Sequence, residues 1–429
     1  MDLLIKDGRI IDPSQGIDEV GSILISDGKI EKIDNSIPED GCHVIDASGL
    51  IVCPGFIDMH THFREPGRED KETLFTCSRA AARGGFTTVV GMPNTNPACD
   101  NQTVVEYVKS RAKEVAIVNM EVVGCISKKR EGKELAEIGE LKRTGAIAVS
   151  DDGGTIQNAD VMRKAFEYCN LWHMPIISHS EDYDLSGDGC MNEGYVSTML
   201  GLPGIPSLSE NVIIGRELLL AEFTNSPIHF THISNKVAVA MIRDAKRRGV
   251  KATCDTMPHY FSLTEEACID YNPMAKVNPP LRTAEDVEAI KKGLEDGTVD
   301  AIATDHAPHL RVEKFYEFAD CENGISGLET AVPLAITNLI HTDALPLTEF
   351  VAKFTINPAK ILHLDRGTLS LGKNADITIL DLEKEEVVDP EQFESKGKNT
   401  PFAGMNLKGM PVYTIVNGKI VMKDRKIIE

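Results

Sequence analysis

Short apolar runs alternate with amphipathic stretches through the middle of the chain. Between about residues 54 and 365, runs rich in Val, Ile and Ala are followed by segments with the 3–4-residue apolar spacing of a helix. The predicted strands are 56–62, 87–92, 117–126, 146–150, 175–179, 228–232, 251–257 and 300–304. The predicted helices are 70–83, 101–114, 131–142, 159–170, 208–224, 236–248, 284–294 and 328–341. Eight strand-then-helix units predict a (β/α)8 TIM barrel over residues 55–365.

The two ends of the chain have a different pattern, which is typical of β-structure. Ile-, Leu- and Val-rich runs at 3–11, 22–33 and 44–52 are broken by Asp-Gly or Ser-Gly pairs, and 375–382 and 411–424 resume this pattern. Neither end alone has enough strands for a stable sheet. We therefore expect residues 1–54 and 366–429 to pair into one small β-sandwich that flanks the barrel of this α/β protein.

Groups that bind metals follow several of the predicted barrel strands. The first strand ends in His60 and His62, whose side chains point the same way because they are two residues apart. Further ligand groups follow the fourth, fifth, sixth and eighth strands: Asp151, Asp152, His179, His232 and Asp305. A lone histidine is more often a hydrogen-bonded core residue, but active sites of such barrels collect at these strand ends. The pattern predicts a site for a divalent metal such as zinc.

Composition and charge restrict the partners. The net charge of −21 argues against nucleic acid or an anionic membrane surface. The ten cysteines include no C-x-x-C pair and are typical of reduced, buried residues in an intracellular protein. No apolar run approaches the ~20 residues of a membrane helix. We expect a soluble, cytoplasmic protein that acts on a small molecule, with no nucleic acid or membrane partner.

Five short motifs are the most specific feature of the sequence. They are HFREPG at 62–67, MPNTNP at 92–97, SDDG at 150–153, TDHAPH at 304–309 and GLET at 327–330. With the pattern of histidines and aspartates, they resemble the amidohydrolase superfamily and, within it, the bacterial-type dihydroorotases, over essentially the whole chain. This resemblance implies zinc-dependent, reversible hydrolysis of (S)-dihydroorotate to N-carbamoyl-L-aspartate, the ring-closing step of pyrimidine (UMP) biosynthesis.

The resemblance also implies roles for individual residues. The metal ligands would be His60, His62, Asp152, His179, His232 and Asp305. The substrate would contact Arg64, Asn94, Asn278, His309 and Gly324. Two zinc ions per subunit would share Asp152 as a bridge, with Asp151 as the alternative, because residues 145–152 lack the carboxylated lysine of many relatives. Asp305 would be both a ligand and the general base that moves a proton from the attacking water to the leaving amide nitrogen.

Some of these residues have simpler interpretations. The bidentate guanidinium of Arg64 suits the substrate carboxylate, but it could instead form an ion pair with a neighbouring glutamate. Asn94 and Asn278 adjoin prolines and could be turn residues. His309 could be a loop histidine without a function. In place of the family's Pro-Phe-Gly lid, the chain has Glu322-Asn323-Gly324, which affects the expected substrate contacts.

Two other functions stay open. One is a related cyclic amidase, like a hydantoinase, dihydropyrimidinase or allantoinase, which would be expected to have the fourth-strand lysine and to lack Arg64 in its FREPG setting. The other is a non-catalytic structural subunit, which would be expected to have lost ligands. Cobalt or manganese could replace zinc. The family also implies a homodimer, and some members associate with aspartate carbamoyltransferase.

Overall fold

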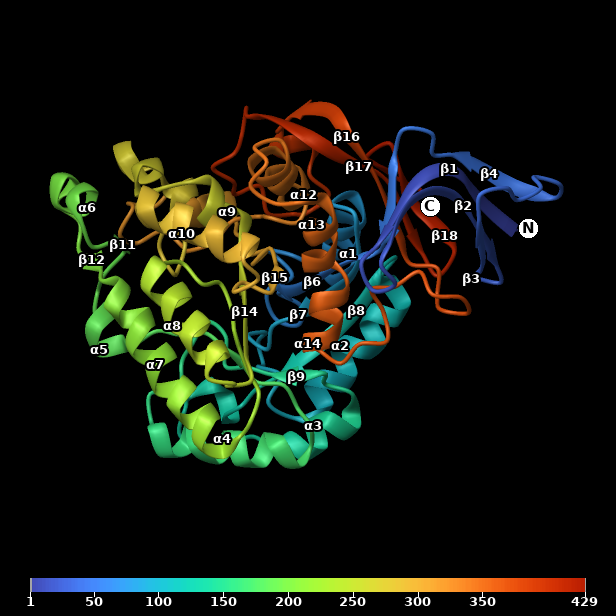
Figure 1. The fold of residues 1–429 in the computed structure, drawn as a ribbon. Helices are drawn as coiled ribbons and strands as arrows, with labels where there is room; N and C mark the ends of the chain where they lie inside the picture. The colour runs from blue at the N-terminus through green and yellow to red at the C-terminus, as the bar shows by residue number, and fades with distance from the viewer. Residues whose placement is uncertain (1, 429) are drawn as a thin grey trace.

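Two four-stranded parallel sheets form the barrel wall in the computed structural model, which describes residues 2–428 (Figure 1). The first contains β6 (Phe56–Thr61), β7 (Phe86–Gly91), β8 (Asn119–Gly124) and β9 (Ala148–Val149). The second contains β10 (Ile177–Ser178), β13 (Ile228–Phe230), β14 (Ala252–Thr256) and β15 (Ala301–Ile302). Parallel bridges join Val149 to Ile176 and Thr61 to His306, so the eight strands close into a ring. The predicted barrel is confirmed.

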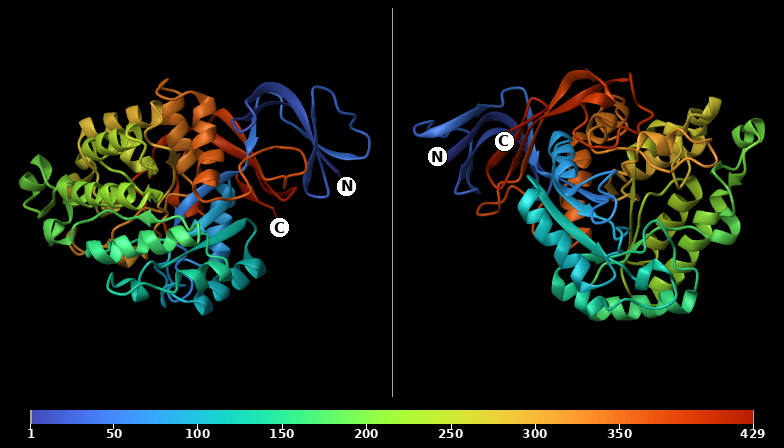
Figure 2. Two further views of the ribbon diagram at one scale, coloured as in Figure 1. Left: turned by 60° about the horizontal axis from the view of Figure 1, so that its bottom comes forward. Right: turned by 180° about the vertical axis from the view of Figure 1, so that it is seen from behind.

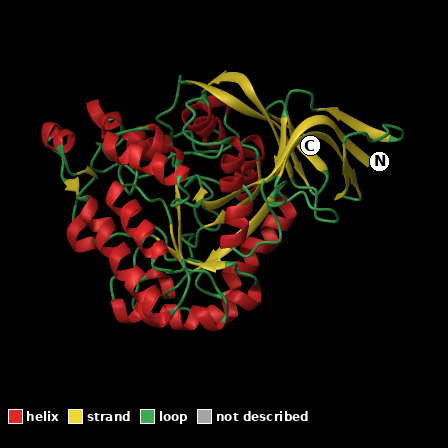
Figure 3. Ribbon diagram, in the orientation of Figure 1, coloured by secondary structure: helices red, strands yellow, loops and turns green. Residues whose placement is uncertain are grey.

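Helices surround this ring, as Figures 2 and 3 show. The long ones are α1 (Leu74–Arg83), α2 (Gln102–Val115), α4 (Ala159–Leu171), α7 (Ser207–Thr224), α8 (Lys236–Arg247) and α10 (Ala284–Glu295). Every residue of β6 and β7 is buried, as expected for parallel strands covered on both faces. Helix α8 begins where it does because the Asn235 side chain accepts hydrogen bonds from the amides of Val237 and Ala238.

The structure differs from the sequence prediction at three helices and contains further short elements. Helix α1 begins at Leu74 and not at residue 70. Lys129, Arg130 and Gly132 have left-handed backbone angles, so α3 (Ile138–Thr144) begins several residues later than predicted, after a 3-10 turn η1 (Lys128–Arg130). The predicted helix 328–341 is α12 (Ala331–Ala335) followed by a π-helical turn η4 (Ile336–Ile340). Further short elements lie in the connections of the barrel and toward the carboxyl end of the chain: α5 (Tyr183–Ser186), β11 (Met191–Asn192), α6 (Tyr195–Leu200), β12 (Gly204–Ile205), α9 (Pro258–Ser262), η2 (Glu265–Tyr271), η3 (Pro273–Ala275), α11 (Arg311–Lys314), α13 (Leu347–Phe354), α14 (Ile356–Ile361) and η5 (Pro390–Gln392).

Strands from both chain ends pair into one nine-stranded sheet beside the barrel, as predicted for these segments (Figure 1). From the amino end come β1 (Asp2–Asp12), β2 (Ile17–Ser26), β3 (Lys29–Asp34), β4 (Cys42–Asp46) and β5 (Ile51–Pro54). From the carboxyl end come β16 (Ile377–Val387), β17 (Asn406–Val416), β18 (Lys419–Lys423) and β19 (Lys426–Ile427). Strand β5 pairs with both β1 and β16 and therefore joins the two sets. Only Gly55 separates β5 from β6, and a Cβ there would lie 2.1 Å from Thr87 Oγ1.

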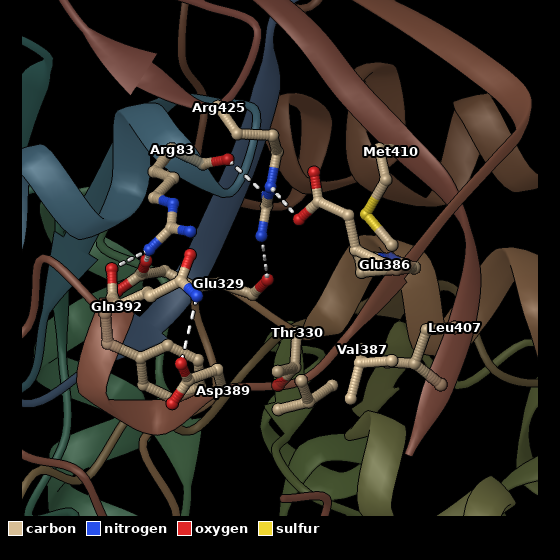
Figure 4. Close-up of a pocket in the computed structure, with 13 residues that line it drawn as sticks. Arg83, Glu329, Thr330, Glu386, Val387, Asp389, Gln392, Leu407, Met410 and Arg425 are labelled. Atoms are coloured by element: carbon tan, nitrogen blue, oxygen red, sulfur yellow. Dashed lines mark hydrogen bonds and ion pairs between the residues drawn. The ribbon is translucent and has the colours of Figure 1, made fainter. Parts of the chain in front are cut away.

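Two arginines, the buried Arg83 and the half-buried Arg425, connect the barrel to this sheet (Figure 4). Arg83, at the end of α1, donates from Nη1 to Glu329 Oε2 at 2.9 Å. Arg425, from the turn between β18 and β19, donates to the Arg83 carbonyl at 2.7 Å and to Glu386 Oε2 at 3.2 Å. The cavity that these residues line measures about 30 Å³, little more than a water molecule occupies. We interpret it as a structural junction.

No helix among residues 2–428 combines the length and apolarity that a membrane span requires.

The junction predicts a pH dependence of stability. Burial raises the pKa of Glu329 to about 7, although the guanidinium groups of Arg83 and Arg425 oppose the rise. In the unfolded chain the glutamate pKa is about 4.3. Above that pH the unfolded state loses its proton first, so Glu329 lowers the free energy of unfolding as pH rises toward 7. As pH rises from 4 to 8, the free energy of unfolding of the wild type should therefore fall by about 3 kcal/mol relative to that of Glu329→Gln, as measured by urea unfolding. A pH-independent difference would contradict this.

Candidate active site

The six predicted metal ligands converge at the carboxyl ends of the barrel strands. They are His60 on β6, His62 just after β6, Asp152 after β9, His179 after β10, His232 after β13 and Asp305 after β15, and all six are buried. A pocket of about 250 Å³ opens onto this group. The five predicted substrate contacts line the same pocket: Arg64, Asn94, Asn278, His309 and Gly324. The pocket lining thus includes the residues predicted to contact metal and substrate except His60, which belongs to the cluster but does not line the pocket.

Asp152 lies at the centre of the cluster, between two pairs of imidazoles. Its Oδ2 is 3.3 Å from His60 Nε2 and 3.7 Å from His62 Nε2. Its Oδ1 is 3.5 Å from both His179 Nδ1 and His232 Nε2. Each carboxylate oxygen thus faces a different pair of nitrogens, which is the arrangement that a bridge between two cations requires.

Asp151 faces away from these imidazoles. Its Oδ1 accepts hydrogen bonds from the backbone amides of Ile126 (2.9 Å) and Ser127 (3.0 Å), and its Oδ2 accepts one from the Ser127 hydroxyl. Asp151 therefore closes the loop after β8. Of the two candidate bridges, only Asp152 lies among the predicted ligands.

Asp305 completes the cluster from β15. Its Oδ1 lies 2.8 Å from His62 Nε2 and 3.5 Å from His60 Nε2. The backbone of Asp305 has φ +48° and that of His232 has φ +45°, a left-handed conformation that is costly for residues other than glycine. Such strain persists where the surrounding structure imposes it, and it is concentrated at functional sites. Both side chains belong to the central cluster.

The donor set fits a divalent metal. Among the described residues, His60 Nε2 and Asp152 Oδ1 are buried atoms without a hydrogen-bond partner, although buried polar atoms are normally paired. Burial lowers the pKa of His60 and of His179, but the Asp152 carboxylate outweighs burial and raises the pKa to about 9 and about 10 respectively. A cation would take the place of these protons. Four imidazoles and two carboxylates are typical zinc ligands.

A threonine and a buried carboxylate orient His60 and His232. His60 Nδ1 is 2.7 Å from Thr231 Oγ1, which donates to Asp255 Oδ1 at 3.0 Å. The Thr231 oxygen must then accept from His60 Nδ1–H, which leaves Nε2 with the free lone pair that a metal requires. Asp255 also accepts from the His232 amide at 2.6 Å. Sequence reasoning missed Thr231 and Asp255, although a charged residue inside the apolar run 251–257 was a usable signal.

Polar contacts also fix His62 and His179. His62 Nδ1 lies 3.0 Å from Asn94 Oδ1, and His179 Nε2 lies 3.3 Å from Glu181 Oε2. Glu181 in turn accepts from Asn278 Nδ2 at 3.0 Å. Asn94 and Asn278, predicted as substrate contacts, therefore also hold the groups around the metal ligands.

Arg64 faces the pocket and not a neighbouring glutamate. Its Nε donates to the Pro308 carbonyl at 3.2 Å, and its Nη2 lies 3.3 Å from His309 Nε2. Glu65 instead accepts from the Leu74 amide at 2.8 Å and from Arg111 at 3.3 Å.

The backbone at Gly324 requires glycine. Its φ is +136°, and a Cβ there would lie 2.6 Å from the Cβ of Ala307.

Comparison with known proteins agrees with this geometry. The sequence model that describes the amidohydrolase family matches residues 51–421 of this chain. The chain is 49% identical over 426 residues to a dihydroorotase of Acetivibrio thermocellus and 52% identical over 427 residues to one of Syntrophus aciditrophicus, covering 99% of this chain and 100% of each relative. A solved L-hydantoinase (dihydropyrimidinase) of Arthrobacter aurescens is 27% identical with a TM-score of 0.90, covering 100% of this chain and 97% of that one. The chain therefore belongs to the amidohydrolase family and, within it, to the dihydroorotases.

The geometry predicts different effects for the two adjacent aspartates. Because Asp152 faces both imidazole pairs, Asp152→Asn should weaken zinc binding by at least about 10-fold, a loss typical even of groups that only support ligands. Asp151→Asn should leave the zinc content unchanged and lower the unfolding midpoint, because it weakens a loop contact. Metal analysis after reconstitution with zinc measures the first effect and urea unfolding the second. Loss of zinc in Asp151→Asn alone would contradict the assignment.

Proposed function

We propose that this chain catalyses the zinc-dependent, reversible hydrolysis of (S)-dihydroorotate to N-carbamoyl-L-aspartate, the ring-closing step of pyrimidine (UMP) biosynthesis. The observation that carries the proposal is a half-buried cation, Arg64, in the same pocket as the predicted ligand cluster. Burial lowers the pKa of Arg64, which means that its charge is costly without an anionic partner. Dihydroorotate supplies a carboxylate for this position and a cyclic amide for the cluster.

His60, His62, Asp152, His179, His232 and Asp305 would hold two zinc ions, with Asp152 between them. When bound, zinc polarises the amide carbonyl and lowers the pKa of the attacking water to near 7. The imidazole-rich donor set favours zinc over manganese, which prefers carboxylate and water ligands, whereas cobalt accepts the same donors as zinc.

Asp305 would move the proton. Burial raises its pKa, but the hydrogen-bonded His62 and the nearby His60 outweigh burial and hold the pKa well below its usual range. The ionised carboxylate would accept a proton from the attacking water and deliver it to the leaving amide nitrogen. In the reverse direction Asp305 would deprotonate the carbamoyl nitrogen as the ring closes.

Arg64 and His309 would hold the substrate carboxylate, while Asn94, Asn278 and Gly324 would border the ring. The Glu322-Asn323-Gly324 segment lines the pocket and occupies the position of the family's lid.

The similarity to an L-hydantoinase supports a second candidate, a cyclic amidase for neutral rings. Two features disfavour the cyclic amidase: Arg64 lines the pocket, and residues 145–152 contain no lysine. A third candidate, a structural subunit, is disfavoured because the six ligand positions are intact.

Substrate comparison tests the proposed function. Zinc-reconstituted protein should open the ring of dihydroorotate and leave hydantoin and dihydrouracil largely unreacted. Arg64→Ala should raise KM for dihydroorotate by about 10-fold or more, because a hydrogen-bonded charge contributes about 1.5–3 kcal/mol. Its zinc content should stay at the wild-type level. Turnover of the neutral rings would favour the cyclic amidase, and no turnover with zinc bound would favour the structural subunit.

Asp305→Asn separates proton transfer from metal binding. The amide keeps an oxygen for coordination but cannot accept the proton, so we expect kcat to fall by about 100-fold or more with the fold retained. Steady-state kinetics measures kcat, and circular dichroism checks the fold. Near-normal turnover would remove Asp305 from the role of base.

We expect a homodimer in the cytoplasm. The outer face of α7 supports this, because Leu208, Leu219 and Phe223 are 53%, 67% and 75% exposed, and a second copy of the chain would cover such a patch. Association with aspartate carbamoyltransferase remains a proposal from the family. Sedimentation of the pure protein, with and without that enzyme, tests both; a monomer would contradict the dimer.

A further inference from the structure

A buried lysine that the proposed reaction does not use lies behind the substrate pocket. Lys71, between β6 and α1, is only 4% exposed. Its Nζ lies 3.0 Å from His309 Nδ1, 3.0 Å from Glu313 Oε1 and 3.4 Å from Glu322 Oε1. His309 and Glu322 both line the pocket, so Lys71 contacts it through these two side chains and is not itself a lining residue.

Two independent contacts define the same tautomer of His309. An ammonium group only donates, so Nδ1 must accept the hydrogen bond from Lys71. On the other side of the ring, Nε2 is 2.8 Å from the Asn323 carbonyl oxygen, which only accepts, so Nε2 must carry the proton. Burial, and then the charges of Arg64, Lys71 and Lys314, hold the pKa of His309 well below its usual range. The ring is therefore neutral, with Nε2–H toward the pocket.

This tautomer decides whether His309 attracts or repels an anion. Arg64 Nη2, which only donates, lies 3.3 Å from His309 Nε2 and by itself favours the other tautomer. The shorter contacts of Lys71 (3.0 Å) and the Asn323 carbonyl (2.8 Å) oppose it and keep the proton on Nε2. A carboxylate placed between Arg64 and His309 can then accept from both. In the other tautomer, Nε2 would present a lone pair to the carboxylate. Without Lys71, the nearest acceptor for a proton on Nδ1 would be Glu313 Oε2, at 3.6 Å, which favours that other tautomer.

We propose that Lys71 is a positioning residue for substrate selection, which holds His309 in the Nε2–H form so that His309 and Arg64 together bind the substrate carboxylate. The proposal rests on the proposed function, because it takes dihydroorotate as the anion. The Asn323 carbonyl, from the segment in the lid position, accepts the His309 proton in this structure. The incoming carboxylate would replace this contact.

Steady-state kinetics of three variants test the role. Lys71→Met removes the donor but keeps the length of the side chain, and it should raise KM for dihydroorotate by about 10-fold with a smaller effect on kcat. Lys71→Arg keeps a donor and should show a smaller rise in KM. Lys353→Met is the matched control, since Lys353 is also buried and donates to the Val299 carbonyl at 2.8 Å, away from the pocket. It should leave KM unchanged.

The split between KM and kcat separates this role from a general loss of structure. In Lys71→Met, burial and the charges of Arg64 and Lys314 still hold the pKa of His309 low, so the ring should stay neutral between pH 6 and pH 8. The ratio of the variant's KM to the wild-type KM should therefore be raised and constant over this range. An unchanged KM, or a fall in kcat as large as the rise in KM, would overturn the proposal.

Nitrogen NMR of histidine-labelled protein tests the tautomer without any turnover. At pH 8, wild-type His309 should be protonated on Nε2 and unprotonated on Nδ1, and Lys71→Met should shift the proton toward Nδ1. If the His309 imidazole of the wild type is protonated on Nδ1, the role of Lys71 is overturned, whichever cyclic amide the enzyme hydrolyses. Failure of wild-type protein to hydrolyse dihydroorotate, with the expected tautomer present, would instead overturn the proposed function.

Discussion

The structure around the site depends on one carboxylate, Asp152, placed between two pairs of imidazoles. Burying charged groups is costly unless each has a partner, and here six ionisable side chains share one cavity. They satisfy one another only because strand ends far apart in sequence meet at one edge of the barrel. The left-handed backbones of His232 and Asp305 are part of the same requirement, since both residues belong to the central cluster.

The flanking sheet supports the site as well as the fold. The segment between β16 and β17 reaches the barrel mouth, where Asn399 accepts from the His309 amide at 2.9 Å. The same side chain donates to the carbonyls of Ala307 (3.0 Å) and Gly324 (2.9 Å). The chain after the barrel thus fixes the loops that carry the proposed carboxylate site. The hydrogen bond from Arg83 to Glu329 stabilises a second contact between the barrel and the sheet, at the arginine junction described above.

Periodicity predicted the barrel and the strand-end residues because both follow from repeated local patterns. The late start of α3 could not be predicted in this way, since the left-handed backbone at Lys129 and Arg130 has no apolar signal. The choice between Asp151 and Asp152 needed coordinates, because adjacent residues point in different directions. The contact of Lys71 with His309 joins residues 238 positions apart in loops, where spacing carries no information.

Anomalous diffraction at the zinc edge, from crystals of zinc-loaded protein, tests the central claim most directly. We expect two peaks, one beside His60 and His62 and one beside His179 and His232, with one oxygen of Asp152 directed at each. A single peak at saturating zinc, or two peaks with Asp152 turned away from both, would contradict the claim that this carboxylate organises the site.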